Sequence, residues 1–317
     1  MDIATRGRSH LNELVSKLDS EKDLSKVFTY WPKKSFNNLK NAKVHSFLPY
    51  FLPYFVYSKF IGYSKILHDF YDRNTRIDSL IRDSINEIIL TDVNFSHHFV
   101  DSYHAVLIDS PTSSFEFQIK QWEREREVTG VEIPRLNFTK NTYKKVSDAG
   151  VFAEAKQIII PSSFSKSTYN LPSEKLTINP FWFSYDGQLI VDTRCKKDFN
   201  LVYIGIVCPS KGIHYLFEAV SMLKTSTITI NIIGSISNKR YIKYLKNKYP
   251  NLNVIFHGYL SQNAINDLLV RMDLAVMPSV SEGLPLSYLN CIQNGVPIVS
   301  SYESGLSDIL GSDFSYH

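Results

Sequence analysis

The chain has 317 residues, of which 44% are hydrophobic and 21% charged, as in ordinary globular proteins with ample core material. A formal net charge of +4 is too small to predict nucleic-acid binding, and we expect no nucleic-acid partner. The three cysteines show no C-x-x-C spacing, which argues against a zinc site and a disulfide framework. The first residues lack the apolar core of a signal peptide, and no apolar run reaches the ~18 residues of a membrane span. We therefore expect a cytoplasmic protein of two domains without a metal site.

The chain opens with a strand, a polar loop and a helix. Residues 2–5 predict the strand, and apolar residues from Leu11 to Leu18 fall at helical spacing. This order is the usual start of a doubly wound α/β domain. Within the loop, Gly7, Arg8 and His10 are candidates for facing an anion at the start of the helix. An ordinary turn between strand and helix is the alternative.

Residues 45–71 are dense in aromatic side chains, which alternate with Lys59 and Lys65. One interpretation is a patch that contacts a membrane surface or a lipid-linked acceptor, with lysines near the head groups. The protein would then be peripheral on the inner face of the membrane. The alternative is that these aromatic residues pack inside the domain, where aromatic side chains are commonly buried.

The remainder of the N-terminal half alternates between strands and helices. Apolar spacing predicts helices at 77–90, 118–128 and 140–155, and strands at 27–30, 105–108, 157–160 and 175–178. Ser113 lies in the polar loop that follows strand 105–108, which places it at the ligand-binding edge of the sheet. The alternating Glu and Arg residues of 118–128 indicate a solvent-exposed face with i,i+4 ion pairs.

Residues 185–199 are polar and lack a sustained period, which is typical of a linker. We therefore predict an N-terminal domain over 1–185 and a C-terminal domain over 186–317. The second domain has strands at 201–207, 227–233, 253–256, 274–277 and from 298, with helices between them. Strands that alternate with helices imply a parallel sheet with right-handed crossovers.

Glu282 and Gly283 follow the buried strand 274–277, and a short helix is predicted over 286–293. In an open α/β sheet the loop from a strand to the next helix lies at the carboxyl edge, where ligands bind. The first amides of a helix suit a phosphate. We therefore expect a phosphorylated ligand at this corner.

Four segments of the C-terminal half match one family pattern. Residues 205–212 resemble a G-R-L-x-x-x-K-G turn, 257–261 a G-x-L/V-[ST] segment, 278–290 a P-S-x-x-E-G-x-x-L-x-x-L-E motif and 295–299 a G-x-P-V-V strand. The chain thereby resembles the retaining glycosyltransferases of family 4, whose GT-B fold has two Rossmann-like domains facing a cleft. These motifs are confined to residues 201–308, although weaker similarities extend through the chain.

The resemblance implies a nucleotide-sugar donor, UDP- or GDP-linked, on the C-terminal domain and a saccharide or lipid-linked acceptor on the N-terminal domain. Lys211 would neutralise the departing diphosphate without a metal or other cofactor, and Glu282 would bind the donor sugar. The other donor-binding candidates are Gly205, Gly234, Gly283, Leu284, Pro285, Leu286 and Asn290. The acceptor or phosphate loop would include Gly7, Arg8, His10 and Ser113. The expected activity is that of a retaining hexosyltransferase in surface polysaccharide biosynthesis.

Three departures from the family pattern are visible. Ile206 replaces the arginine beside the phosphate, and Asn290 replaces the second glutamate, which holds ribose hydroxyls in the family. Family members also continue beyond the equivalent of His317, so we expect either a C-terminally truncated or unusually short form that lacks the last helices, or an incomplete sequence. The alternative is a non-catalytic GT-B relative that binds a nucleotide sugar or supports a partner transferase. A nucleotide-sugar epimerase or hydrolase is a third interpretation.

Overall fold

The computed structural model describes residues 1–5, 11–29, 32–47, 88–92, 105–109, 112–133, 135–180, 198–223 and 227–310. It divides into two compact units. The first comprises Met1–Pro111, Lys144–Ile159 and Leu171–Thr177, and the second comprises Thr112–Tyr143, Ile160–Asn170 and Ile178–His317. The predicted boundary between residues 185 and 186 lies outside the described residues, so the division at that point stays a prediction.

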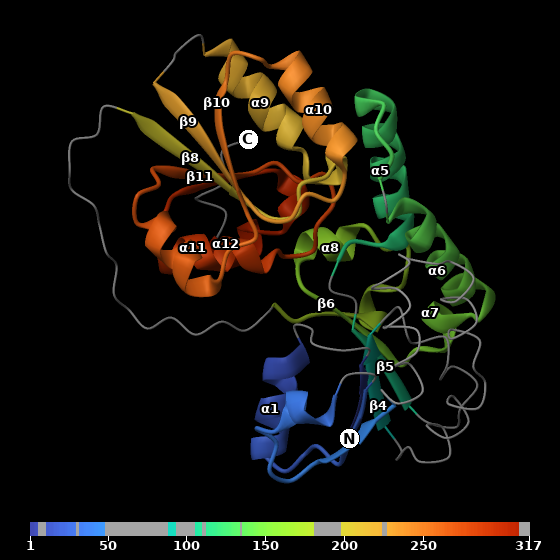
Figure 1. Ribbon diagram of the computed structural model, residues 1–317. Helices are drawn as coiled ribbons and strands as arrows, with labels where there is room; N and C mark the ends of the chain where they lie inside the picture. Colours follow the sequence, from blue (N-terminus) through green and yellow to red (C-terminus); the bar gives the residue numbers. More distant parts are fainter. Residues whose placement is uncertain are drawn as a thin grey trace. The chain divides into compact units, whose positions relative to one another are not determined.

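The first sheet has seven strands among the described residues, in the order β3-β2-β1-β4-β5-β6-β7. Figure 1 labels its strands β4, β5 and β6. The strands are β1 (Asp2–Thr5), β2 (Lys26–Thr29), β3 (Lys43–Ser46), β4 (Ile88–Asp92), β5 (Ala105–Asp109), β6 (Gln157–Ile160) and β7 (Leu176–Ile178). All the pairs from β3 to β6 are parallel. Helix α1 (Leu11–Ser20) contributes Val15 to a core with Ile3, Val27 and Leu90.

The second sheet has five parallel strands in the order β10-β9-β8-β11-β12. The strands are β8 (Phe199–Ile204), β9 (Ile228–Ile233), β10 (Asn253–Gly258), β11 (Leu274–Met277) and β12 (Ile298–Ser300), with helices α9 (Ile213–Met222), α10 (Lys239–Lys248), α11 (Gln262–Leu269), α12 (Leu286–Gln293) and α13 (Ser307–Leu310). The chain runs outward from β8 to β10 and then returns to β11 on the other side of β8. Because the strand order reverses there, the carboxyl ends of β8 and β11 form the ligand-binding point of such a sheet.

Among the described residues, the N-terminal half of the sequence has four further helices, α5 (Phe115–Thr129), α6 (Leu136–Asp148), α7 (Val151–Glu154) and α8 (Ser163–Ser167). The 3-10 turns are η1 (Lys33–Phe36), η3 (Ser173–Lys175), η4 (Pro209–Lys211) and η5 (Tyr302–Ser304). Helices α5 and α8 belong to the second unit. Val131, two residues after α5, lies in the same apolar core as the strands β8 and β9. None of the helices that the structure describes is long and apolar enough to cross a membrane.

The structure corrects two helix predictions. Residues 88–90 of the predicted helix 77–90 belong to strand β4, and residues 77–87 lie outside the described residues. The run Ile88-Ile89-Leu90 is short and begins with two β-branched residues, and its pairing with β1 and β5 overrides the helical spacing. The predicted helix 140–155 is two helices, α6 and α7, because Gly150 takes a left-handed conformation with φ of 63°.

Candidate functional site

The lysine turn, residues 209–212, connects strand β8 to helix α9. Lys211 ends the short η4 helix, and Gly212 has φ of 67°, a conformation that glycine adopts without strain. A Cβ atom at Gly212 would collide with the carbonyl oxygen of Pro278. The backbone N–H of Val280 also donates to the carbonyl of Ser210 at 3.3 Å. The lysine turn therefore packs directly on residues 278–285, which follow β11 and which we call the glutamate loop.

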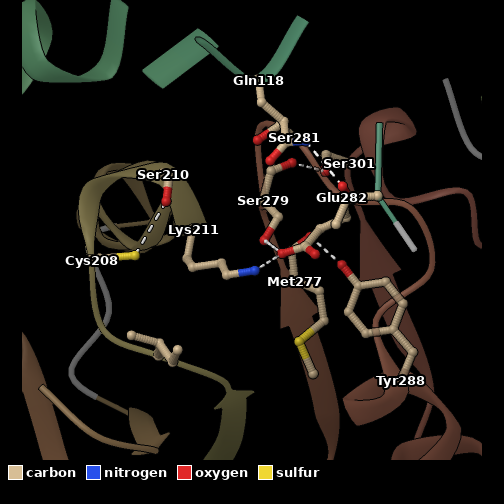
Figure 2. Close-up of polar contacts among 12 residues, drawn as sticks. Gln118, Cys208, Ser210, Lys211, Met277, Ser279, Ser281, Glu282, Tyr288 and Ser301 are labelled. Atoms are coloured by element: carbon tan, nitrogen blue, oxygen red, sulfur yellow. Dashed lines mark hydrogen bonds and ion pairs between the residues drawn. The ribbon is translucent and has the colours of Figure 1, made fainter. Parts of the chain in front are cut away.

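Glu282 is the acidic residue of this loop and is only 8% exposed. Its Oε1 atom contacts the Nζ of Lys211 and accepts a hydrogen bond of 3.1 Å from the Ser279 hydroxyl (Figure 2). The Glu282 backbone N–H donates to the carbonyl of Glu303 at 2.9 Å. Main-chain and side-chain bonds together hold the carboxylate facing the amine. Sequence reasoning predicted both residues, and the structure brings them into contact.

Burial lowers the pKa of Lys211 to about 8. The carboxylate of Glu282 acts in the opposite direction, because a nearby negative charge favours the protonated amine. The Lys211 side chain is still 27% exposed, so water and dissolved ligands can reach it. The site therefore holds a cation that can exchange its carboxylate partner for a stronger anion, such as a diphosphate.

Gly205 and Gly234 follow the carboxyl ends of β8 and β9. A Cβ atom at Gly234 would collide with the carbonyl oxygen of Gly205, so the two backbones need glycine to approach this closely. The hydroxyl of Tyr203 donates to the carbonyl of Ile206 at 3.0 Å and fixes the chain between β8 and the lysine turn. These glycines thus keep the sheet edge free of side chains, as the donor-binding prediction requires.

The start of helix α12 contains the other predicted donor residues. Pro285 precedes the helix and provides no side-chain cap. The carbonyl of Gly283 accepts a hydrogen bond of 2.7 Å from Ser162, and the side chain of Leu284 is buried. Leu286 at the first helical position is 49% exposed. The first amides of α12 are therefore not satisfied by a capping side chain, which suits an anionic ligand.

Asn290 lies in the middle of α12 and is half-buried. Its Oδ1 atom accepts from Gln262 of α11 at 3.2 Å, and its backbone carbonyl accepts from the Asn294 side chain at 2.8 Å. The asparagine therefore links α11 to α12. Its Nδ2 atom is a donor that a ribose hydroxyl could accept.

The predicted acceptor loop is not assembled by the described residues. Gly7, Arg8 and His10 lie outside them, as do residues 48–71 of the predicted membrane patch. Ser113 is 1% exposed, and its hydroxyl has no hydrogen-bond partner in the described part of the chain. The membrane patch and the first three loop residues stay predictions.

Helix α5 contributes residues to this region that sequence reasoning missed. The prediction of a solvent-exposed face is wrong for Glu125, which is 1% exposed. Its Oε2 atom lies 2.9 Å from the Nε2 of His214, and its Oε1 accepts from the Tyr215 hydroxyl at 2.9 Å. One turn earlier, the indole N–H of Trp122 donates to the Ser281 hydroxyl at 2.7 Å. The sequence did contain a signal for the burial of Glu125. One helix face carries this residue together with the positions Phe115, Gln118, Trp122 and Thr129.

A cavity of about 420 Å³ adjoins these residues. Its lining includes Gln121 and Arg124 of α5, Tyr215 of α9, and Ser279 and Ser301 beyond the ends of β11 and β12. The hydroxyl of Ser301 donates to the carbonyl of Ser279 (Figure 2). All of these residues belong to the second unit. The glutamate loop thus has an open pocket of mixed polar and apolar lining beside it.

Comparison with known proteins identifies relatives of the C-terminal half. Residues 192–315 match the family model "Glycosyl transferases group 1". The colanic acid biosynthesis glycosyltransferase WcaL of Escherichia coli, named as putative, is 24% identical over 125 residues, which are 37% of this chain and 31% of that protein. The lipopolysaccharide 1,2-N-acetylglucosaminetransferase of Salmonella typhimurium is 24% identical over 280 residues, 81% of this chain and 69% of that protein. The chain spans about a third of the length of the first curated relatives it matches.

Solved structures extend the similarity to the whole chain. The crystal structure of Anabaena HepE in complex with UDP and glucose matches with a TM-score of 0.62 at 13% identity. The match covers 100% of this chain and 83% of HepE. A likeness at this identity shows the fold, and with the two parallel α/β sheets it confirms the predicted GT-B architecture.

Proposed function

We propose that this protein is a retaining glycosyltransferase that moves a hexose from a nucleotide-sugar donor to a saccharide or lipid-linked acceptor in surface polysaccharide biosynthesis. The observation that carries the proposal is the contact between Lys211 and Glu282 at the carboxyl end of β11, inside the segment that matches the family model. The pair offers a cation for a leaving diphosphate and a carboxylate for sugar hydroxyls.

The chemistry of sugar transfer asks for both groups. As the glycosidic bond breaks, the sugar develops oxocarbenium character and the diphosphate gains negative charge. The amine of Lys211 and the positive end of α12, which has no side-chain cap, stabilise that charge. Glu282 binds the donor sugar through hydrogen bonds to its hydroxyls, and Asn290 binds the ribose hydroxyls of the nucleotide. The acceptor hydroxyl attacks on the face that the diphosphate leaves and gives its proton to the departing phosphate oxygen, so the anomeric configuration is retained.

The similar proteins support a transferase over a non-catalytic relative. WcaL is named for colanic acid biosynthesis, and the Salmonella relative is named as an N-acetylglucosaminetransferase. The HepE structures hold UDP with glucose and UDP-glucose. We therefore propose UDP-sugars as the first donors to test, with GDP-sugars as the second.

The decisive experiment measures nucleotide-sugar binding by isothermal titration calorimetry across UDP- and GDP-sugars, with Lys211→Ala and Glu282→Ala beside the wild type. Lys211→Ala should weaken binding about 10-fold or more, because a hydrogen bond to a charged group contributes ~1.5–3 kcal/mol. Lys243→Ala on α10 and Glu218→Ala on α9 are matched controls, because both side chains are exposed on the same unit. They should bind as the wild type does.

Three outcomes separate the alternatives. If no nucleotide sugar binds the wild type, the proposal is wrong. If a sugar binds equally to Lys211→Ala and Glu282→Ala, the assignment of the site is wrong. If a nucleotide sugar binds normally but is neither hydrolysed nor transferred to any saccharide or lipid-linked acceptor, the protein is a non-catalytic relative.

A further inference from the structure

Helix α5 contacts both halves of the candidate site, although it lies about 90 residues before the lysine turn in sequence. Trp122 and Glu125 are three residues apart and therefore share one face of the helix. Trp122 donates to Ser281, the residue before Glu282. Glu125 pairs with His214 and Tyr215, which begin the helix that follows Lys211. One helix face thus bridges the glutamate loop and the lysine turn.

The bridge on the lysine side is buried, and its polar groups lie within hydrogen-bond distance of one another. His214 is 1% exposed, and its Nδ1 atom lies 2.8 Å from the hydroxyl of Tyr241, which is itself buried. The Tyr241 hydroxyl also accepts from the His214 backbone N–H at 3.1 Å. The Nδ1 side of His214 is thus held by Tyr241, while its Nε2 lies close to the Glu125 Oε2 without a hydrogen bond of good geometry. The buried hydrogen bond from Tyr215 to Glu125 favours one geometry, because breaking it would leave two polar groups unpaired.

We propose that α5 positions the two donor-binding side chains, with Trp122 holding Glu282 through Ser281 and Glu125 holding Lys211 through His214 and Tyr215. This inference rests on the proposed donor site. Trp122, Glu125 and Tyr215 are positioning residues, since they act through Lys211 and Glu282. The positions of Lys211 and Glu282 thus depend on α5, a helix outside residues 192–315, which match the family model.

The first test removes one hydroxyl from each of two similar contacts. Tyr215→Phe breaks the bond to Glu125, and Tyr143→Phe is the matched control, because Tyr143 also donates to a glutamate of α5, Glu116 in its first turn. Tyr215→Phe should raise the Kd of the donor about five- to tenfold, within the range of coupling between contacting residues. Tyr143→Phe should change it by less than about twofold. Glu125→Gln, which keeps the side-chain shape, should act in the same direction as Tyr215→Phe.

A double-mutant cycle distinguishes positioning from general loss of structure. In a Lys211→Ala background, Tyr215→Phe should produce no further change in donor Kd, because its effect passes through the amine. Ser281→Ala should likewise lose its effect in a Glu282→Ala background. Equal effects of Tyr215→Phe with and without Lys211 would overturn the inference.

A ligand-free measurement keeps the test independent of the proposed function. The acylation rate of each lysine by an amine-reactive reagent is followed by peptide mass spectrometry in the folded protein. Tyr215→Phe should raise the rate at Lys211 at least about threefold, because the amine leaves its buried position, and should leave exposed Lys243 unchanged. An unchanged rate at Lys211 overturns the inference even when donor binding is intact. A changed rate without donor binding would retain the positioning role and refute the donor site.

Discussion

The charge of Lys211 makes donor binding depend on pH in a defined direction. Burial lowers the pKa of Lys211 to about 8, and only the protonated amine pairs with a diphosphate. Affinity is therefore full below the pKa and is lost as the pH rises through it. Because the Glu282 carboxylate opposes the shift, the midpoint is expected between pH 8 and the ordinary lysine value of about 10.4.

The size of the effect follows from the protonated fraction. With a pKa of about 8, roughly nine-tenths of the amine is charged at pH 7 and about one-hundredth at pH 10. A charge-assisted hydrogen bond contributes ~1.5–3 kcal/mol, so its loss weakens binding roughly 10- to 150-fold. With the midpoint at about pH 8, the Kd of the donor should rise about 10-fold or more between pH 7 and pH 10, and a higher midpoint moves the same rise to correspondingly higher pH.

The assay is isothermal titration of the best-binding nucleotide sugar at half-unit steps of pH. Lys211→Arg is the control, because a guanidinium stays charged throughout this range. Its Kd should be nearly constant up to pH 10, whatever its absolute affinity. A wild-type Kd that does not change, or a change of the same size in Lys211→Arg, would show that another group controls the pH dependence.

Two further predictions concern the turn that presents Lys211. Gly212→Ala should lower unfolding stability by ~3 kcal/mol or more, because its Cβ atom meets the Pro278 carbonyl in a left-handed conformation. Gly130→Ala has a similar φ but nothing within 4 Å, so its loss of ~1 kcal/mol is the control, and equal urea midpoints would refute the steric argument. Ile206→Arg should tighten nucleoside diphosphate binding about fivefold by adding a second cation near Lys211. Unchanged affinity in titration calorimetry would show that position 206 does not face the diphosphate.

The contact network gives the lysine turn two separate supports. Gly212 lets the turn pack closely against the Pro278 carbonyl, and Glu125 accepts a hydrogen bond from Tyr215 in the first turn of the following helix. An exposed lysine on a mobile turn would lose side-chain entropy on binding an anion. A lysine that the fold already orients makes that loss smaller, which is the usual basis of a preorganised electrostatic site.

Local sequence determined most of the second unit. The predicted strand 274–277 and helix 286–293 become β11 and α12 with the predicted bounds. Lys211 and Glu282 were predicted to share one donor site because residues 205–212 and 278–290 resemble family 4 motifs, and the structure brings the two side chains into contact. The bounds of β11 and α12 follow from apolar spacing and turn residues that lie within a few positions of each boundary.

Tertiary structure decided what depends on distant partners. Glu125 looked like one charge of a solvent-exposed helix, because no residue near it in sequence reports the His214 and Tyr215 that bury it. The run 88–90 became a strand through pairing with β1 and β5, which no local pattern distinguishes from a helix. Sequence by itself therefore determined which residues reach the ligand-binding edge. Only packing decided how they are held there, since that depends on contacts between segments roughly 30 to 160 residues apart.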